Sequence, residues 1–135
     1  MMARIAIVMT SMLALSASAL GADDAATKRG QLLFMQCRAC HDTQPSSVQK
    51  VGPNLTGFFG RPAASAPGYK AYSAALKKSG VVWNDENLDK WLQRPSGMVP
   101  GTTMVFAGVQ APADRAAIIA YLKSATAAAA AQAQQ

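Results

Sequence analysis

The sequence predicts an all-α domain with three to five short helices joined by long loops. Apolar residues recur at helical spacing in several separate segments. Between those segments, residues 42–68 and 95–109 contain turn-forming Gly and Pro and show no regular pattern. In a compact domain, loops of that length are expected to be functional or to wrap around something.

The first helix is expected over residues 26–40. Four residues at positions i, i+3, i+4 and i+7 share one face of it: Gly30, Leu33, Phe34 and Cys37. A glycine inside a helix costs about 1 kcal/mol relative to alanine. Gly30 therefore indicates that another helix approaches closely at this point.

Further helices follow in the second half of the chain. A short one over residues 69–79 would stop at Gly80 in a C′ position. Asn84 is a good N-cap for the next helix, which must end before Pro95. The last helix is expected over residues 112–123 and opens on a proline, which suits a first helical turn.

The N-terminus is typical of an export signal over residues 1–22. Arg4 supplies a basic start, an apolar stretch follows, and residues 17–19 form a small-x-small cleavage pattern. A retained membrane anchor is the alternative, but the stretch is short for a bilayer, which needs about 20 apolar residues. The mature protein would then consist of a domain over residues 23–123 and an Ala/Gln-rich tail over 124–135, frayed or disordered.

Composition excludes several classes of protein. Two cysteines and one histidine cannot supply four ligands to a structural zinc, nor can two cysteines build a disulfide-dense scaffold. Aromatic residues make up only 7% of the chain, which indicates that something other than protein fills its middle. The net charge of +6 is spread without a dense basic run, so an acidic protein partner is favoured over nucleic acid.

Cys37, Cys40 and His41 form a C-x-x-C-H segment, the spacing of c-type haem attachment. Two thiols three residues apart can each bond one haem vinyl group, and the following imidazole then lies beneath the iron. We interpret the segment as the site of one covalent haem c. A plain disulfide, a thioredoxin-like redox pair and a surface histidine beside two buried cysteines are the alternatives.

Methionine is the remaining soft ligand for the far side of the iron. Met35 lies on the attachment helix and cannot reach the opposite face of the ring. Met98 and Met104 are the candidates, because both lie in the second irregular stretch. We prefer Met104, since it follows a Pro-Gly turn that can hold a thioether in place, and interpret Met98 as a packing residue.

The chain also resembles a class I cytochrome c of the soluble mitochondrial and bacterial type, with a single haem. The matching segments occur in family order from Gly30 to Lys123: Cys37-x-x-Cys40-His41, Val51-Gly52-Pro53-Asn54-Leu55, Gly60-Arg61, Ala66-Pro67-Gly68-Tyr69, Val82-Trp83, Pro100-Gly101-Thr102-x-Met104-x-Phe106-Ala107-Gly108 and Ala120-Tyr121-Leu122-Lys123. The resemblance implies a small cytochrome c fold in which the helices and loops surround one covalently attached haem.

The resemblance also implies roles for individual residues. His41 and Met104 would be the iron ligands, and the carbonyl oxygen of Pro53 would accept a hydrogen bond from His41 Nδ1. Four side chains would surround the haem propionates: Arg61, Tyr72, Trp83 and Thr102. Phe106 would cover the haem. For Tyr72 and Trp83, ordinary aromatic packing is the alternative.

The resemblance further implies that the first helix packs on the last. Gly30 and Phe34 would contact Tyr121. At two positions the chain departs from the family pattern. Trp91 replaces a tyrosine near the methionine sulfur, so the hydrogen bonds around the ligand should differ. Thr103 replaces a lysine before Met104, which removes one contact of the usual basic docking surface.

These observations predict a one-electron carrier in a periplasmic electron-transfer chain of a bacterium, not an enzyme. The partners would be redox proteins with acidic docking surfaces: an oxidase, a reductase or a dehydrogenase. We expect a monomer without nucleic-acid binding or stable membrane insertion. The alternatives are the haem c subunit of an exported dehydrogenase complex, and a protein whose labile Met104 frees the iron for peroxide or gas.

Overall fold

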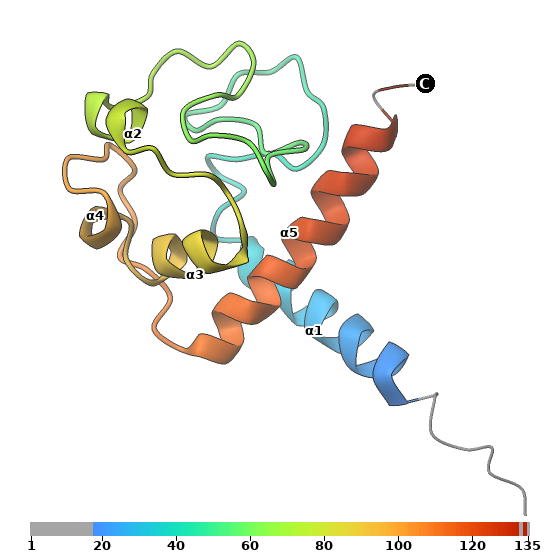
Figure 1. The fold of residues 1–135 in the computed structure, drawn as a ribbon. Coiled ribbons are helices and arrows are strands. Elements are labelled where there is room, and N and C mark those ends of the chain that lie inside the picture. Colours follow the sequence, from blue (N-terminus) through green and yellow to red (C-terminus); the bar gives the residue numbers. More distant parts are fainter. Residues whose placement is uncertain (1–17, 133, 135) are drawn as a thin grey trace, which may run out of the picture.

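The computed structural model describes residues 18–132 and 134, and the described residues form five helices without a sheet (Figure 1). These are α1 (Ser18–Phe34), α2 (Ala74–Lys78), α3 (Asp85–Gln93), α4 (Pro95–Met98) and α5 (Pro112–Gln132). The predicted all-α class with long loops is confirmed. Most of the predicted export signal, residues 1–17, lies outside the described residues.

Helices α1 and α5 cross and form the main helix–helix contact of the fold (Figure 1). A Cβ atom at Gly30 would lie 1.9 Å from the carbonyl oxygen of Ala117 and 2.8 Å from Cβ of Tyr121. Only a glycine allows the two backbones this approach. One turn further along, the rings of Phe34 and Tyr121 pack with their centroids 5.4 Å apart.

Helix α3 contributes buried residues to the apolar core beside α5. Its N-cap is Asn84, whose side-chain oxygen accepts the backbone N–H of Asn87 at 2.8 Å, as a capping residue should. Three residues on one side of it are buried: Leu88, Trp91 and Leu92. The fully buried Ile118 of α5 belongs to the same apolar cluster. The segment 35–73 covers the other side of the domain as a long irregular stretch (Figure 1).

The first helix is shorter at its C-terminal end than predicted. α1 ends at Phe34, and the chain continues in successive turns, with the N–H of Cys37 bonded to Phe34 O and that of Cys40 to Cys37 O. The carbonyl oxygen of Cys40 accepts the N–H of Gly52 at 2.9 Å. The hydrogen-bond partner of the Cys40 carbonyl is therefore a distant loop and not the next helical turn. Helical spacing in the sequence alone could not indicate this.

The other helix bounds also differ from expectation. α2 begins at Ala74, not at residue 69, because the side chain of Ser73 caps it by accepting the N–H of Leu76. The irregular stretch 95–109 contains the single turn of α4, which opens on Pro95. The Ala/Gln-rich tail is helical as part of α5 as far as Gln132.

The C-terminal part of α5 packs against the long loop. Thr126 is 1% exposed and Ala129 is fully buried. The N–H of Gly57 donates to the carbonyl oxygen of Thr126 at 3.3 Å, and Ala130 lies close to Gly57. Within the described part of the chain, no helix combines the length and the apolar character needed to cross a membrane.

Candidate functional site

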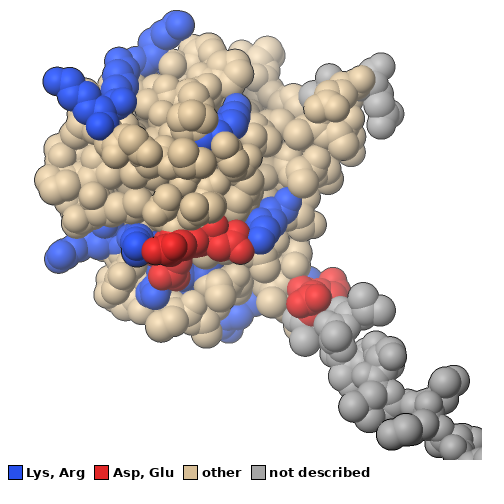
Figure 2. Space-filling view, viewed as in Figure 1, with Lys and Arg blue, Asp and Glu red and all other residues tan. Residues whose placement is uncertain are grey.

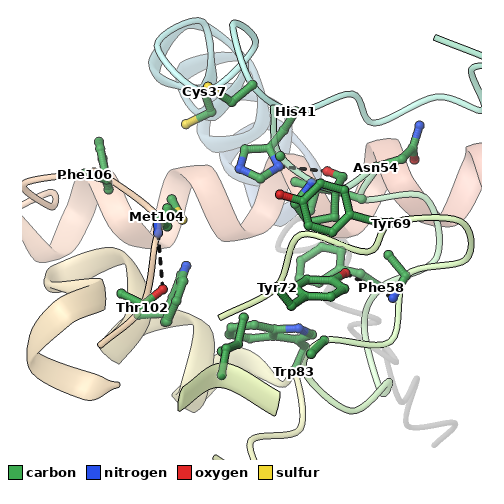
Figure 3. Close-up of a pocket in the computed structure, with 18 of the residues that line it drawn as sticks. Cys37, His41, Asn54, Phe58, Tyr69, Tyr72, Trp83, Thr102, Met104 and Phe106 are labelled. Atoms are coloured by element: carbon green, nitrogen blue, oxygen red, sulfur yellow. Dashed lines mark hydrogen bonds between the residues drawn. The ribbon is translucent and has the colours of Figure 1, made fainter. Parts of the chain in front are cut away.

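A largely apolar cavity of about 300 Å³ lies between the helices and the irregular segments (Figure 3). That volume is at the lower end of the range for ligand pockets. All residues predicted to bind the cofactor line this one cavity: Cys37, Cys40, His41, Pro53, Arg61, Tyr72, Trp83, Thr102 and Met104. They come from segments spread over most of the domain, so folding is what brings them together.

The two cysteines lie on the turns that follow α1, and both are free thiols in this structure. Burial, together with the neighbouring Cys40 thiol, raises the pKa of Cys37 to about 11. Redox-active cysteines have a lowered thiol pKa, because the thiolate is the reactive form. The raised pKa therefore disfavours the thioredoxin-like interpretation, and both thiols line the cavity.

His41 is held in one orientation by the loop opposite it. Its Nδ1 lies 2.8 Å from the carbonyl oxygen of Pro53 (Figure 3). Because a carbonyl oxygen only accepts, Nδ1 carries the proton and Nε2 of the neutral ring has a free lone pair. Burial lowers the pKa of His41, while the Pro53 hydrogen bond opposes this more weakly. The neutral ring is the form that binds a metal.

Gly52 makes that orientation possible, and the sequence analysis assigned it no role. A Cβ at this position would lie 2.5 Å from Cε1 of His41 and 2.9 Å from the carbonyl oxygen of Cys40. The loop can reach the histidine only because residue 52 has no side chain. The sequence indicated a turn at the Gly-Pro pair, but it did not indicate that this turn lies against His41.

Met104 enters the cavity from the loop between α4 and α5 (Figure 3). The hydroxyl oxygen of Thr102 accepts the backbone N–H of Met104 at 3.4 Å. Trp91, 6% exposed, is a further lining residue. Met98 packs against the apolar cluster and does not line the cavity, whereas Met35 is largely exposed.

One part of the cavity wall carries polar and aromatic side chains. Nε of Arg61 is buried and has no hydrogen-bond partner among the described residues. The hydroxyl of Tyr72 accepts the N–H of Ala66 at 3.1 Å. Trp83 packs edge-on against Trp91, with centroids 5.4 Å apart.

Tyr69 is a lining residue that the sequence analysis named only as part of a motif. Its hydroxyl donates to the carbonyl oxygen of Val51 at 2.6 Å, and its ring packs edge-on against Tyr72. It thereby joins two parts of the long loop across the cavity. Loop residues show no periodicity, so no sequence signal distinguished Tyr69 from its neighbours.

These residues fit a haem. The cavity wall is apolar over most of its area, as a flat porphyrin requires, and the two thiols and the imidazole come from one turn of chain. The partnerless Nε of Arg61 is the kind of buried donor that needs an anionic group such as a propionate. The donor set of imidazole nitrogen and thioether sulfur suits iron in haem.

Comparison with known proteins also indicates a haem protein. The family model of cytochrome c matches residues 27–126. The chain belongs to the cytochrome c family. Cytochrome c2 of Rhodomicrobium vannielii is 45% identical over 107 residues, which cover 79% of this chain and 83% of that protein. Cytochrome c of Euglena viridis is 48% identical over 99 residues, with coverage of 72% and 94%.

Among solved structures, cytochrome cH from Methylobacterium extorquens superposes with a TM-score of 0.67 at 44% identity. The match covers 73% of this chain and 97% of that one, and it confirms the predicted small cytochrome c fold. As a member of the family, the chain is an electron-transfer protein and not an enzyme. Its cofactor is covalent haem c with iron, for which Cys37 and Cys40 have the required spacing.

Proposed function

We propose that this protein is a one-electron carrier of a periplasmic electron-transfer chain, with its haem iron bound by His41 and Met104. The observation that carries the proposal is that both side chains line one cavity from opposite ends of the domain sequence. When bound, a haem iron supplies reversible transfer of one electron between its ferric and ferrous states.

His41 and Met104 would together hold the iron of a bound haem. The Pro53 hydrogen bond holds the His41 ring in the tautomer whose Nε2 can donate a lone pair. The Met104 thioether is a soft ligand that favours the ferrous state, which raises the reduction potential relative to a second imidazole. With both positions filled, no open site is left for oxygen or peroxide, and few atoms need to move when the charge changes.

The polar part of the wall would hold the propionates. A buried carboxylate is costly unless it is paired or hydrogen-bonded. Nε of Arg61 is a charged donor with no hydrogen-bond partner among the described residues, and Thr102, Tyr72 and the indole N–H of Trp83 are further groups that can donate. Phe106 and Trp91, which also line the cavity, would exclude water from the methionine side.

Partner recognition would depend on the basic surface. Lys70, Lys77 and Lys78 pair with none of the described carboxylates, and basic side chains gather at the upper left of Figure 2, in the region where Figure 1 places α2. Lys50 and Lys90 are neutralised by Asp42 and Glu86. The unpaired lysines suit redox partners with acidic docking surfaces, in encounters that weaken with salt.

Residues 1–22 would direct export to the bacterial periplasm and be removed, which leaves the domain over 23–123 with its C-terminal extension. Export is compatible with the cofactor, because bacteria attach haem c to the protein after export. The two thiols need to stay reduced only until that attachment. We expect the mature protein to be a monomer that exchanges electrons with several partners in a respiratory chain.

Optical spectra of the purified exported protein test the ligation. The oxidised protein should show the near-infrared charge-transfer band of a sulfur–iron bond. Met104→Ala should lose this band and lower the reduction potential, because sulfur no longer stabilises the ferrous state. Met98→Ala is the matched control, since Met98 packs on the core outside the cavity and should keep both properties.

Loss of the band in Met98→Ala but not in Met104→Ala would overturn the ligand assignment. Intact mass and haem staining on a denaturing gel test the covalent cofactor, and a mass equal to the polypeptide alone contradicts it. Purification with a stoichiometric larger subunit would instead indicate a haem subunit of an exported dehydrogenase complex.

A further inference from the structure

The loop that carries Met104 makes its backbone hydrogen bonds to the rest of the protein at its two ends. Residues 99–109, here called the ligand loop, connect α4 to the approach of α5 (Figure 1). At its start, the N–H of Val99 donates to Pro95 O of α4 at 2.9 Å, and within the loop the N–H of Thr102 donates to Val99 O at 3.1 Å. At its end, the N–H of Val109 donates to Leu92 O of α3 at 2.8 Å. Between them, the only hydrogen bond among the described residues runs from Met104 N to Thr102 Oγ1 at 3.4 Å, and the Met104 side chain packs against the apolar cluster.

The end of the ligand loop is fitted tightly against α3. Gly108 has φ +101°, a conformation that other residues rarely adopt. A Cβ at Gly108 would lie 2.0 Å from the carbonyl oxygen of Gln93, so the backbone of the ligand loop contacts the backbone at the end of α3. The position of the Met104 thioether relative to α3 therefore depends in part on this end of the loop staying in place.

A buried guanidinium adds further hydrogen bonds at that end. Arg115, in the first turns of α5, is 6% exposed. Its Nη1 donates to the carbonyl oxygens of Val109 at 3.0 Å and Gln110 at 2.9 Å. Its Nε and Nη2 donate to the two carboxylate oxygens of Asp89 on α3, at 2.7 and 3.3 Å. One side chain thus joins α3, α5 and the end of the ligand loop.

The Asp89 carboxylate is what orients this guanidinium. A two-pronged arginine–carboxylate pair fixes the plane of the guanidinium, and its charge-assisted bonds are stronger than neutral ones. With the plane fixed by Asp89, Nη1 faces the two carbonyl oxygens. Without the carboxylate, the buried charge of Arg115 would be left uncompensated and would tend to turn toward solvent.

We propose that Arg115, oriented by Asp89, is a positioning residue that keeps the ligand loop closed over the iron and so limits how often Met104 leaves it. This inference rests on the proposed function, in which Met104 is the axial ligand. Loosening the pair should open the loop locally, and the sixth coordination position should then become accessible to small added ligands.

The test compares two substitutions on α3 in the haem-loaded protein. Asp89→Asn weakens the pair with Arg115. Asp85→Asn is the matched control, because Asp85 also pairs with a basic residue of α5, Lys123 at 2.8 Å, and makes no contact with the ligand loop. Both variants change the same charge on the same helix, and both remove an ion pair between α3 and α5.

Two readouts are measured for both variants. The first is amide hydrogen exchange of Val109 and the rest of the ligand loop, with α1 as the internal reference. The second is the rate at which the ferric protein binds imidazole. For Asp89→Asn we expect both rates to rise about tenfold, which corresponds to about 1.4 kcal/mol for one weakened charge-assisted contact. Exchange in α1 should stay unchanged, and Asp85→Asn should match the wild type in both readouts.

A merely structural role would not give this pattern. It would shift guanidinium-induced unfolding, followed by circular dichroism, and raise exchange in α1 and the ligand loop together. The inference is overturned if exchange of the ligand loop in Asp89→Asn stays at the wild-type rate, or if Asp85→Asn accelerates it equally. Arg115→Lys is the second variant. One amine cannot replace both prongs and both carbonyl contacts, so it should also accelerate loop exchange.

If the proposed iron ligand is wrong, the experiments give a different pattern. If the wild-type ferric protein lacks the sulfur–iron band, Met104 is not the ligand. Hydrogen exchange of the ligand loop still decides whether Arg115 and Asp89 hold it in place, because that readout does not depend on which atom binds the iron.

Discussion

His41 Nδ1 donates to the carbonyl oxygen of Pro53 over 2.8 Å, and this contact helps to join the cysteine-bearing turns to the long loop. It sets the tautomer of the only histidine in the chain. The contact depends on Gly52, since its backbone lies so close to the imidazole that no side chain fits between them.

Gly52→Ala should therefore displace either the imidazole or the loop. The new methyl group would meet the ring at 2.5 Å and the Cys40 carbonyl oxygen at 2.9 Å. We expect destabilisation of about 3 kcal/mol, typical of severe overpacking, and a weakened bond between His41 and the iron. Guanidinium unfolding and the visible spectrum of the reduced protein measure the two effects.

Gly80→Ala is the control for Gly52→Ala. Gly80 has φ +67° and open space around its Cα, so alanine there costs only backbone strain of about 1–2 kcal/mol. Its haem spectrum should match the wild type. An unchanged spectrum and stability in Gly52→Ala would contradict the role given to this glycine.

Gly30→Ala should separate α1 from α5. The Cβ would lie 1.9 Å from the carbonyl oxygen of Ala117, which belongs to helix backbone and cannot rotate away. We expect a loss of about 3 kcal/mol or more in the free energy of unfolding, measured by guanidinium titration. Ala25→Gly, at an exposed position of the same helix, should cost only about 1 kcal/mol. Equal losses in the two variants would argue against the close contact.

Removal of residues 124–135 should destabilise the domain. Thr126 and Ala129 are buried, and the carbonyl oxygen of Thr126 accepts the N–H of Gly57. The lost methyl burial and hydrogen bond should together cost on the order of 2 kcal/mol. The control is removal of residues 132–135, which leaves these contacts in place. A truncation after Lys123 that unfolds at the wild-type guanidinium concentration would mean that the extension contributes nothing.

Tyr72 should make the protein sensitive to alkaline pH. Burial raises the pKa of Tyr72, opposed by the Ala66 hydrogen bond and the charge of Arg61. The unfolded chain therefore loses this proton first, and stability should fall as the pH rises above about 10. Below that pH both states are protonated and the effect is absent. Tyr72→Phe should unfold with a flatter pH dependence above pH 10, whereas Tyr69→Phe, which keeps Tyr72, should retain the slope.

Loss of the cofactor should unfold most of the chain. The cavity lies within the apolar cluster, and a haem that buries on the order of 400 Å² of apolar surface there would contribute about 10 kcal/mol at about 25 cal/mol/Å². That is comparable to the whole stability of a small domain. The Cys37→Ala, Cys40→Ala double variant, produced without haem, should show little helical circular dichroism. Native-like helicity in this variant would refute the expectation.

Local chemistry explains what could be predicted from the sequence. The spacing of Cys37, Cys40 and His41 is a property of five consecutive residues, and it indicated the cofactor without any knowledge of the fold. The N-cap at Asn84 depends on a hydrogen bond three residues along the chain, so it too could be located in advance. The all-α class followed from apolar periodicity in the same way.

Contacts between distant residues decided the rest. α1 ends at Phe34, and the turns that follow are bonded to the long loop through Gly52 N–H and Cys40 O, while α5 continues to Gln132 with Thr126 packed against the loop at Gly57. Nothing near Arg115 in the sequence distinguishes it from a surface arginine, yet its side chain is buried between α3 and the ligand loop. By itself, the sequence determined which residues can bond a haem. Only tertiary packing decided how the loops that present them are held, because those hydrogen bonds join residues that local patterns cannot relate.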